Sequence, residues 1–361
     1  MNDANELISF IASMSGEGNL RVEENLGEGY VRLRVSEAER RQAKHDIQHV
    51  EDIVIEMLRN ARDAGADKVY LATTKEDGVR TLVFLDNGSG VPQDMQKRIF
   101  DARVTSKLES MKMDRWGVHG RGMALFSIKQ NTDEARVVAS DVDLGSVFKV
   151  SVATDRLGER ADQSSWPQAV KDEDGHYVCA RGPHNIIRAA CEFALEELRA
   201  CDVYLGSPSE IAATLHAQAS SRLDASRLLF IDDEAELPVV DRLGLASDAE
   251  DFIRICSGLG LEMSERTAHR ILAGQIKPVR GVTERLLRER DSSSHASAPV
   301  DLAKDRRGLR IAKDDMAQFS RAVERDFNDL ASRYYLNLCG DPKIRVSRDR
   351  ITVTFDLAKE E

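Results

Sequence analysis

Apolar residues between positions 50 and 64 recur three and four places apart, which is the spacing of an amphipathic helix. Two apolar runs follow at 68–74 and 79–85, and the Asp-Gly dipeptide between them is typical of the tight turn of a β-hairpin. Helical and strand periods alternate from about residue 40 to residue 155, and a helix is expected at about 93–101. This pattern predicts a mixed α/β region in the first half of the chain.

The next part of the chain begins with a polar, interrupted stretch at 156–185, which predicts a long loop or an insertion. A helix is expected over 186–200, a short strand at Val203–Leu205 and a second helix over 208–219. This second helix begins with Ser207 and a proline, and proline in the first turn is a helix start signal.

The last third of the chain is predicted to be mainly helical from 247 to 290, with a serine-rich linker after it. A helix over 313–333 and a hairpin of Lys343–Val346 with Ile351–Phe355 are expected at the C-terminus. We therefore divide the chain into an N-terminal segment (1–39), an α/β domain (40–220), a helical region (221–290), a linker (291–300) and a C-terminal helix with a β-hairpin (301–361).

Composition narrows the class of protein. Hydrophobic residues make up 42% and charged residues 31% of the 361 positions, which is a globular balance and excludes a disordered or collagen-like chain. A net charge of −11 disfavours generic nucleic-acid binding, so a DNA role requires a local basic patch. The five scattered cysteines and the lack of a secretory signal predict a cytoplasmic protein with reduced thiols and no zinc site.

The first candidate site element is the helix at 50–64. Glu56, Asn60 and Asp63 follow the helical spacing and form one polar stripe beside its apolar face. A carboxylate and an amide one turn apart can hold a water and a metal ion at the edge of a pocket. The same stripe is also what the exposed side of any helix packed on a sheet shows.

The second element follows the strand at 79–85. Asp86 comes directly after this strand, and an acid there can accept a hydrogen bond from the amino group of adenine. Gly88 and Gly90 allow the backbone to approach a ring or a phosphate closely. Taken alone, this pattern also describes an ordinary turn.

The third element is a glycine-rich stretch from Gly117 to Gly122 that leads into an apolar helix. Exposed backbone N–H groups before a helix N-terminus favour anions such as phosphates. His119, Arg121 and Lys107 could add donors and positive charge. The stretch does not follow a strand and lacks a terminal G-K-[ST], so neither the dinucleotide fingerprint nor the P-loop applies.

Together, and in this order, these elements resemble the GHKL ATPase superfamily, which includes gyrase B, heat-shock chaperone ATPases, histidine kinases and MutL. The residues that carry the resemblance are Glu56, Asn60, Asp63 and Ala64 for the first motif, Asp86 to Gly90 for the second, Gly117 to Gly122 for the third, and Gly145-Ser146 for the last. The N-A-R-D-A-G-A run and Val104-Thr-Ser-Lys107 are most similar to the MutL and topoisomerase VI B-subunit branch.

The resemblance implies a Bergerat-type α/β sandwich, with helices on one face of a mixed sheet, that binds ATP with Mg²⁺. It implies that Glu56 is the general base that activates water and that Asn60 is the metal ligand. Asp86 would recognise the adenine amino group with support from Ser146. The residues expected to contact the nucleotide are Asn60, Asp63, Ala64, Asp86, Gly88, Gly90, Lys107, Gly117, His119, Gly120, Arg121, Gly122 and Ser146.

The expected activity is slow ATP hydrolysis that acts as a conformational switch. ATP would order a lid over 101–122 and dimerise the chain through residues 1–39. The role of residues 1–39 is expected only because members of the superfamily dimerise in this way. Two alternatives stay open. A protein kinase of this superfamily also has a base at the position of Glu56, although few residues precede it for a phosphoacceptor domain. The second alternative is a regulator that binds ATP without hydrolysing it and contacts DNA.

The DNA alternative depends on the region 255–290. A helix that ends at a glycine turn is followed by Ser264 as an N-cap and a second helix, which resembles a helix-turn-helix. Basic residues make this stretch locally positive: Arg266, Arg270, Lys277, Arg280, Arg285, Arg288 and Arg290. An ordinary helical hairpin with solvated arginines explains the same pattern.

Overall fold

The computed structural model describes residues 22–106, 112–114, 117–119, 122–198, 200–223, 231 and 233–287, together with part of the C-terminal region: 316, 319–320, 323–324, 327, 336–340, 342–346 and 351–359. The chain divides into two compact units, residues 1–291 and residues 292–361, and each is described by itself. None of the helices in these described ranges is both long and apolar enough to cross a membrane.

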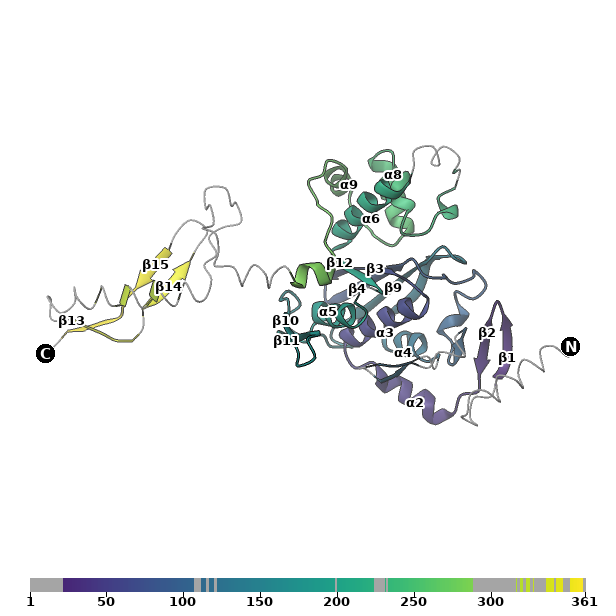
Figure 1. The fold of residues 1–361 in the computed structure, drawn as a ribbon, viewed down its shortest axis with the longest axis horizontal. Coiled ribbons are helices and arrows are strands. Elements are labelled where there is room, and N and C mark those ends of the chain that lie inside the picture. The colour runs from purple at the N-terminus through teal and green to yellow at the C-terminus, as the bar shows by residue number, and fades with distance from the viewer. Residues whose placement is uncertain are drawn as a thin grey trace. The chain divides into compact units, whose positions relative to one another are not determined.

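A five-stranded mixed sheet is the centre of the first unit (Figure 1). Its order is β12 (Asp202–Gly206), β3 (Lys68–Glu76), β4 (Val79–Asp86), β9 (Ser146–Ala153) and β8 (Glu134–Ser140). β12 runs parallel to β3, and all other neighbours are antiparallel. The α/β sandwich that the sequence resemblance implies is therefore confirmed.

The predicted hairpin of this sheet is formed by β3 and β4. Asp77 and Gly78 connect the strands with φ angles of 47° and 78°, so both adopt the left-handed conformation that a two-residue hairpin turn of this type requires. The register pairs Glu76 with Val79 and continues to Val69 with Asp86. This pairing brings Asp86, at the end of β4, to the end of the sheet where α3 finishes.

One face of the sheet is covered by α3 (Val50–Asp63), α5 (Ile186–Glu196) and α4 (Ala124–Asn131). The apolar stripe of α3 is buried against the strands, and Ile53 and Leu58 have no exposed surface. Burial of each such side chain contributes about 1.5–3 kcal/mol to the stability of the fold. The helix that carries Glu56 and Asn60 is thus fixed to the sheet along its length.

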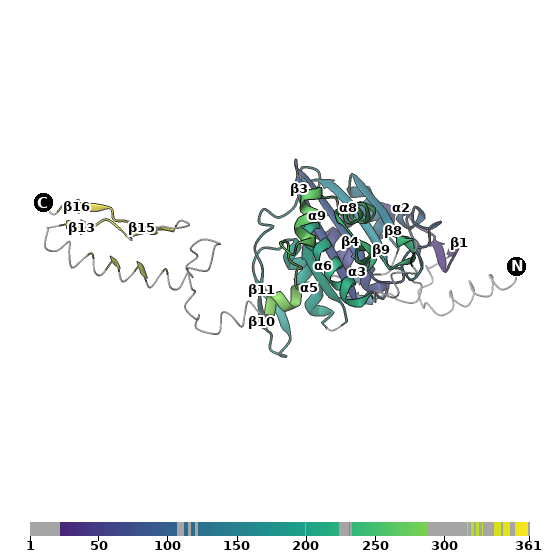
Figure 2. The ribbon, with the colours of Figure 1, turned by 90° about the horizontal axis from the view of Figure 1, so that it is seen from above.

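The other face is also covered, by α6 (Pro208–Arg222), α8 (Ala249–Gly258) and α9 (Glu265–Leu272), as Figures 1 and 2 show. The sandwich therefore has helices on both faces, whereas the resemblance implied them on one. The reason lies in the strands, because β3 and β4 have consecutive apolar residues and a sheet of this kind needs cover on both sides.

The helical region touches the sheet close to the β8–β9 turn. The Val239 N–H donates a hydrogen bond of 2.8 Å to the Leu144 carbonyl. The next residue, Gly145, has a φ of +77°, and a side chain there would collide with the Asp86 carbonyl oxygen. Short 3₁₀ helices, η2 (Glu234–Glu236) and η3 (Arg242–Leu245), link this contact to α8.

The N-terminal segment forms a second sheet with the start of the expected lid. β1 (Val22–Gly27) pairs with β2 (Tyr30–Leu33), and β2 pairs in turn with β5 (Val104–Thr105). α2 (Glu37–Asp46) follows, and it begins with a capping box of Ser36 and Glu39. Residues far apart in the chain are thereby joined at one edge of the first unit.

The sequence predictions for three segments of this unit differ from the structure. The helix expected at 93–101 is a series of turns with a single 3₁₀ helix, η1 (Arg98–Phe100). The stretch at 156–185, predicted to be a long loop or an insertion, contains a hairpin of β10 (Gln168–Lys171) and β11 (Tyr177–Arg181). The region 247–290 is helical only in part, because extended residues separate α8 from α9 and follow α9.

In the second unit, the predicted hairpin is confirmed as β14 (Lys343–Val346) paired with β15 (Ile351–Thr354). β13 (Leu336–Leu338) pairs with β16 (Leu357–Lys359). The expected linker at 291–300 lies outside the described residues, as does most of the helix expected over 313–333.

Candidate nucleotide-binding site

A cavity of about 460 Å³ opens between α3, the ends of β4 and β9, and the segment that precedes α4. This volume is within the range of small-molecule sites. Most of the described residues that the sequence singled out line it: Glu56, Asn60, Asp63, Ala64, Asp86, Gly90, Gly122 and Ser146. Residues from all four motifs therefore meet at one place, although they are up to 90 positions apart in the chain.

The polar stripe of α3 forms one wall of the cavity. The Arg59 Nη1 atom lies 2.7 Å from Glu56 Oε1, and the Arg62 Nε atom lies 3.0 Å from Asp63 Oδ1. Arg62 also reaches Glu197, at 3.1 Å, just after the end of α5. Sequence reasoning missed both arginines, although the three-residue spacing of Glu56 and Arg59 on a helix was a signal that could have revealed the first pair.

Asp86 lies at the end of β4 with only 4% of its surface exposed. Its Oδ1 atom accepts a hydrogen bond of 2.9 Å from the Gly88 N–H, which fixes the carboxylate relative to the loop that follows. Ser146 is its direct partner in the register of β4 and β9. A buried carboxylate at the cavity edge is suited to accept a hydrogen bond from a ring amino group.

Ser140 is a site residue that the sequence did not reveal. It is the last residue of β8 and the register partner of Ser146. Its hydroxyl accepts a 2.8 Å hydrogen bond from the Val91 N–H, donates one of 2.8 Å to the Gly145 carbonyl and lies 3.3 Å from Ser146 Oγ. It thus connects the loop after Asp86 with the turn before Ser146.

The glycines of the second motif have different roles. Gly90 lines the cavity with a φ of +70°, and a Cβ atom there would collide with the Asp141 carbonyl oxygen. Gly88 is not part of the lining. A Cβ at Gly88 would come within 2.8 Å of the Ala64 carbonyl oxygen, so this glycine allows the loop to pack on the end of α3. The Ser89 N–H donates to that same carbonyl at 2.9 Å.

The third motif is described only in part. Lys107, Gly120 and Arg121 lie outside the described residues. Gly117 and His119 belong to β7 (Gly117–His119), which pairs with β6 (Lys112–Asp114), and only their backbone is described. Gly122 lines the cavity, and its carbonyl accepts a hydrogen bond of 2.8 Å from the Arg103 N–H.

The N-terminal segment also contributes to the cavity, which sequence reasoning missed. Tyr30 from β2 and Gln42, Asp46 and Ile47 from α2 and its end belong to the lining. Burial raises the pKa of Tyr30, and a hydrogen bond with Ser106 partly opposes this change. The cavity is therefore completed by the same segment that pairs with β5.

The charge of the lining suits a metal-bound nucleotide. Its described acidic side chains are Asp46, Glu56, Asp63 and Asp86, and Arg59 is the one lysine or arginine among its described members. Mg²⁺ prefers oxygen ligands such as carboxylates and carbonyls, so these residue types fit the ion. Asn60, one turn from Glu56, would hold the ion.

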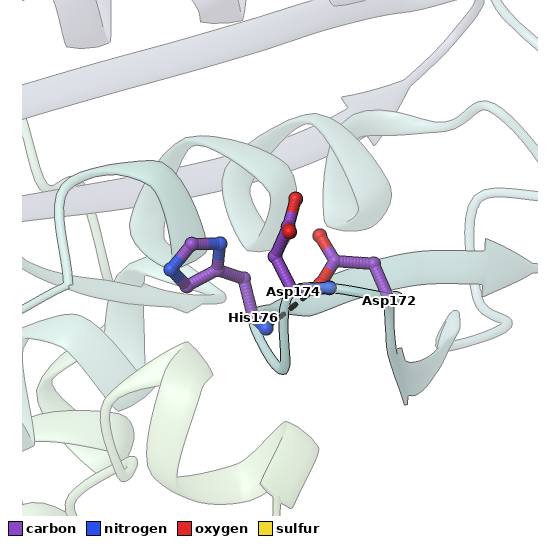
Figure 3. A group of neighbouring side chains, drawn as sticks. All are labelled: Asp172, Asp174 and His176. Atoms are coloured by element: carbon purple, nitrogen blue, oxygen red, sulfur yellow. Dashed lines mark hydrogen bonds between the residues drawn. The ribbon is translucent and has the colours of Figure 1, made fainter.

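One other group in the described ranges has the spacing of metal ligands. Asp172, Asp174 and His176 lie on the turn between β10 and β11 (Figure 3), and all three are exposed. Asp172 Oδ1 accepts hydrogen bonds from the backbone N–H groups of Asp174 and His176, at 3.1 and 2.8 Å. This carboxylate therefore stabilises its own turn, and the group carries no proposal of a site.

A mixed sheet with Asp86 at a strand end, beside a helix that carries Glu56 and Asn60, is the α/β sandwich that the sequence resemblance implies. Residues 47–140 match the family model of the histidine kinase-, DNA gyrase B-, and HSP90-like ATPases. This match confirms the resemblance to GHKL ATPases for this part of the chain and supports ATP binding.

The curated relatives agree with this family. The DNA mismatch repair protein MutL of Staphylococcus aureus, in strains Newman and COL, is 28% identical to the chain over 136 residues. The similarity covers 35% of this chain and 20% of MutL. The chain thus spans about a fifth of the length of the curated relatives it matches.

Proposed function

We propose that the chain binds ATP with Mg²⁺ in the cavity beside α3 and hydrolyses it slowly as a conformational switch. The observation that supports this function is the convergence of Glu56, Asn60, Asp86 and Ser146 around one cavity of about 460 Å³. Phosphoryl transfer needs positioning and charge neutralisation rather than covalent chemistry, and these residue types provide both.

Each residue has a distinct role in this proposal. Glu56 takes a proton from the attacking water, and Asn60 holds the Mg²⁺ ion, which neutralises phosphate charge when it is bound. Asp86 accepts a hydrogen bond from the adenine amino group. Ser146 and Gly90 shape the pocket around the base, and Lys107 with the 117–122 stretch covers the phosphates.

The switch is carried by the connection between the lid and the N-terminal segment. β5 at the start of the lid pairs with β2, and the Arg103 carbonyl accepts a hydrogen bond of 2.9 Å from the Leu33 N–H. Closure of the lid over ATP would move these partners together. The proposal includes ATP-dependent dimerisation through residues 1–39 and places the protein in the cytoplasm. Size-exclusion chromatography with a non-hydrolysable ATP analogue tests the dimerisation.

Steady-state phosphate release from Mg-ATP tests the central claim. The wild type should turn over, whereas Glu56→Ala should bind ATP with similar affinity and release no phosphate. If neither protein releases phosphate while both bind ATP, hydrolysis is wrong. Labelling with γ-phosphate-labelled ATP then tests the kinase alternative, because stable label on protein would indicate phosphotransfer.

A DNA-binding role is the second candidate, and the surface of α9 is the observation that favours it. Arg266, His269 and Arg270 are exposed along this helix, and Lys277 is exposed beyond it. Arg285, in contrast, stacks over the Trp166 ring at 3.9 Å from its centroid. Anisotropy of a labelled duplex at rising salt tests the role, and Arg266→Ala with Arg270→Ala should reduce both affinity and salt dependence.

A further inference from the structure

Two carboxylates on the cavity face of α3 are each bound by an arginine of the same helix. Arg59 binds Glu56 at 2.7 Å, and Arg62 binds Asp63 at 3.0 Å. Arg62 also binds Glu197, so it ties α3 to the end of α5. Arg59 differs because it lines the cavity itself, next to the carboxylate proposed as the base.

The exposure of the first pair is unequal. The Arg59 side chain is 3% exposed, whereas the Glu56 side chain is 21% exposed. The guanidinium is thus held inside the protein and the carboxylate reaches the cavity. Removal of a buried arginine from water is unfavourable unless an acid pairs with it, so this geometry is strongly determined. Both residues also share one helix that is packed on the sheet.

We infer that Arg59 is a positioning residue for Glu56, an assignment that rests on the proposed ATP hydrolysis. A carboxylate has two oxygens, and a guanidinium bound to one of them determines where the other points. Arg59 also balances the charge of Glu56 in a lining whose other charged side chains, among the described residues, are Asp46, Asp63 and Asp86. Arg59 therefore acts through Glu56.

Kinetics of Arg59→Met and Arg59→Lys test this role. Arg59→Met should lower kcat at least about tenfold and leave the Kd for ATP within about threefold of the wild type. Arg59→Lys keeps the charge but not the planar fork, so its kcat should fall by about threefold and exceed that of Arg59→Met.

The matched control is Arg136→Met, which breaks the exposed ion pair of Arg136 with Glu134 on β8 and should leave kcat unchanged. Thermal unfolding of each variant verifies folding, and Arg59→Lys keeps the test decisive if Arg59→Met does not fold. The assignment would be overturned by a wild-type kcat in Arg59→Lys, or by a kcat that is higher in Arg59→Met than in Arg59→Lys. It would also be overturned if the affinity for ATP fell as much as kcat. If the wild type itself releases no phosphate, the proposed function fails, and the role of Arg59 fails with it.

Discussion

Asp86 and Ser146 face each other directly across β4 and β9, and Ser140 faces Ser146 across β9 and β8. Three buried polar residues thus form one row across three neighbouring strands, with 4%, 3% and 8% of their surface exposed, respectively. Residues in such a row have fixed mutual positions, because the register of the sheet sets them. The row therefore holds Asp86 and Ser146 at fixed positions in the cavity lining, where the proposed function has Asp86 bind the adenine amino group.

The first prediction concerns this row. Ser146→Ala should weaken ATP binding about five- to tenfold, because it removes one hydrogen bond from a buried network. Titration of a fluorescent ATP analogue measures the change. Ser151→Ala is the matched control, since its hydroxyl lies 3.2 Å from that of Thr81 on the same two strands but away from the cavity. Equal affinities of the two variants would contradict the role of the row.

A second prediction separates steric from conformational effects at glycine. Gly90→Ala should abolish ATP binding and destabilise the protein, because its Cβ atom would collide with the Asp141 carbonyl oxygen. Gly78→Ala has a similar φ of +78° but nothing within 4 Å of the added atom, so it should cost only about 1 kcal/mol of backbone strain. Urea unfolding and ATP titration measure both. A Gly90→Ala protein that binds ATP normally would contradict the close-packed loop.

The third prediction concerns the pH dependence of stability. Glu159 accepts hydrogen bonds from Arg80 at 2.8 and 3.0 Å and from Lys75 at 2.9 Å. Burial alone would raise the pKa of Glu159, but these bonds outweigh it and lower the pKa below its ordinary value. Because the folded-state pKa is the lower one, the stabilisation is present above pH ~4.3 and is lost as the pH falls through the folded-state value.

Glu159→Gln should therefore destabilise the protein by about 2 kcal/mol at pH 7, since it leaves Arg80 buried without its carboxylate. The difference from the wild type should shrink at pH 3.5, as measured by urea unfolding at both pH values. Glu262→Gln is the control, because Glu262 is 76% exposed in its pair with Lys149 and should have almost no effect. A difference that stays constant with pH would contradict the ion pair.

The fourth prediction uses the thiols. Four of the five cysteines are buried, and Cys339 is exposed. Burial raises the pKa of Cys201 and of Cys256 to about 12, so neither forms the reactive thiolate near pH 8. Mass spectrometry after brief maleimide treatment should find the label at Cys339 in the native protein and at every cysteine in urea. Rapid native labelling of Cys256 would contradict its place in the core.

The sequence predicted the cavity-lining residues that belong to the polar and glycine-rich motifs. Glu56 and Asn60 follow a helical period, and Asp86 follows a clear apolar strand. Each pattern alone was ambiguous, and the order of the four motifs, which resembles that of GHKL ATPases, singled these residues out. Arg59 was missed because a basic residue on a polar helix face is ordinary. Tyr30 was missed because the pairing of β2 with β5 joins distant parts of the chain at the cavity. Ser140 was missed because its role depends on its hydrogen bonds with Val91 and Gly145, which the sequence pattern does not show.

The errors in the fold have a similar origin. The segment 93–101 has helical spacing, but its start is bound to β8 by Val91 and its end leads directly into β5, so a full helix does not form. The strands at 168–171 and 177–181 have one buried residue each, which is too weak an alternation to predict a hairpin. In both cases tertiary contacts decided the local structure.

The hydrogen bond between Val239 and Leu144 has a consequence for how this chain could diverge. It joins residues 233–287 to the turn that carries Gly145 and Ser146, and these helices bury the second apolar face of the sheet. A chimera that exchanged this region for the helices of another protein would have to keep the shape of that apolar face. The five-stranded sheet and the helices of residues 233–287 are therefore expected to evolve together, and not as interchangeable modules.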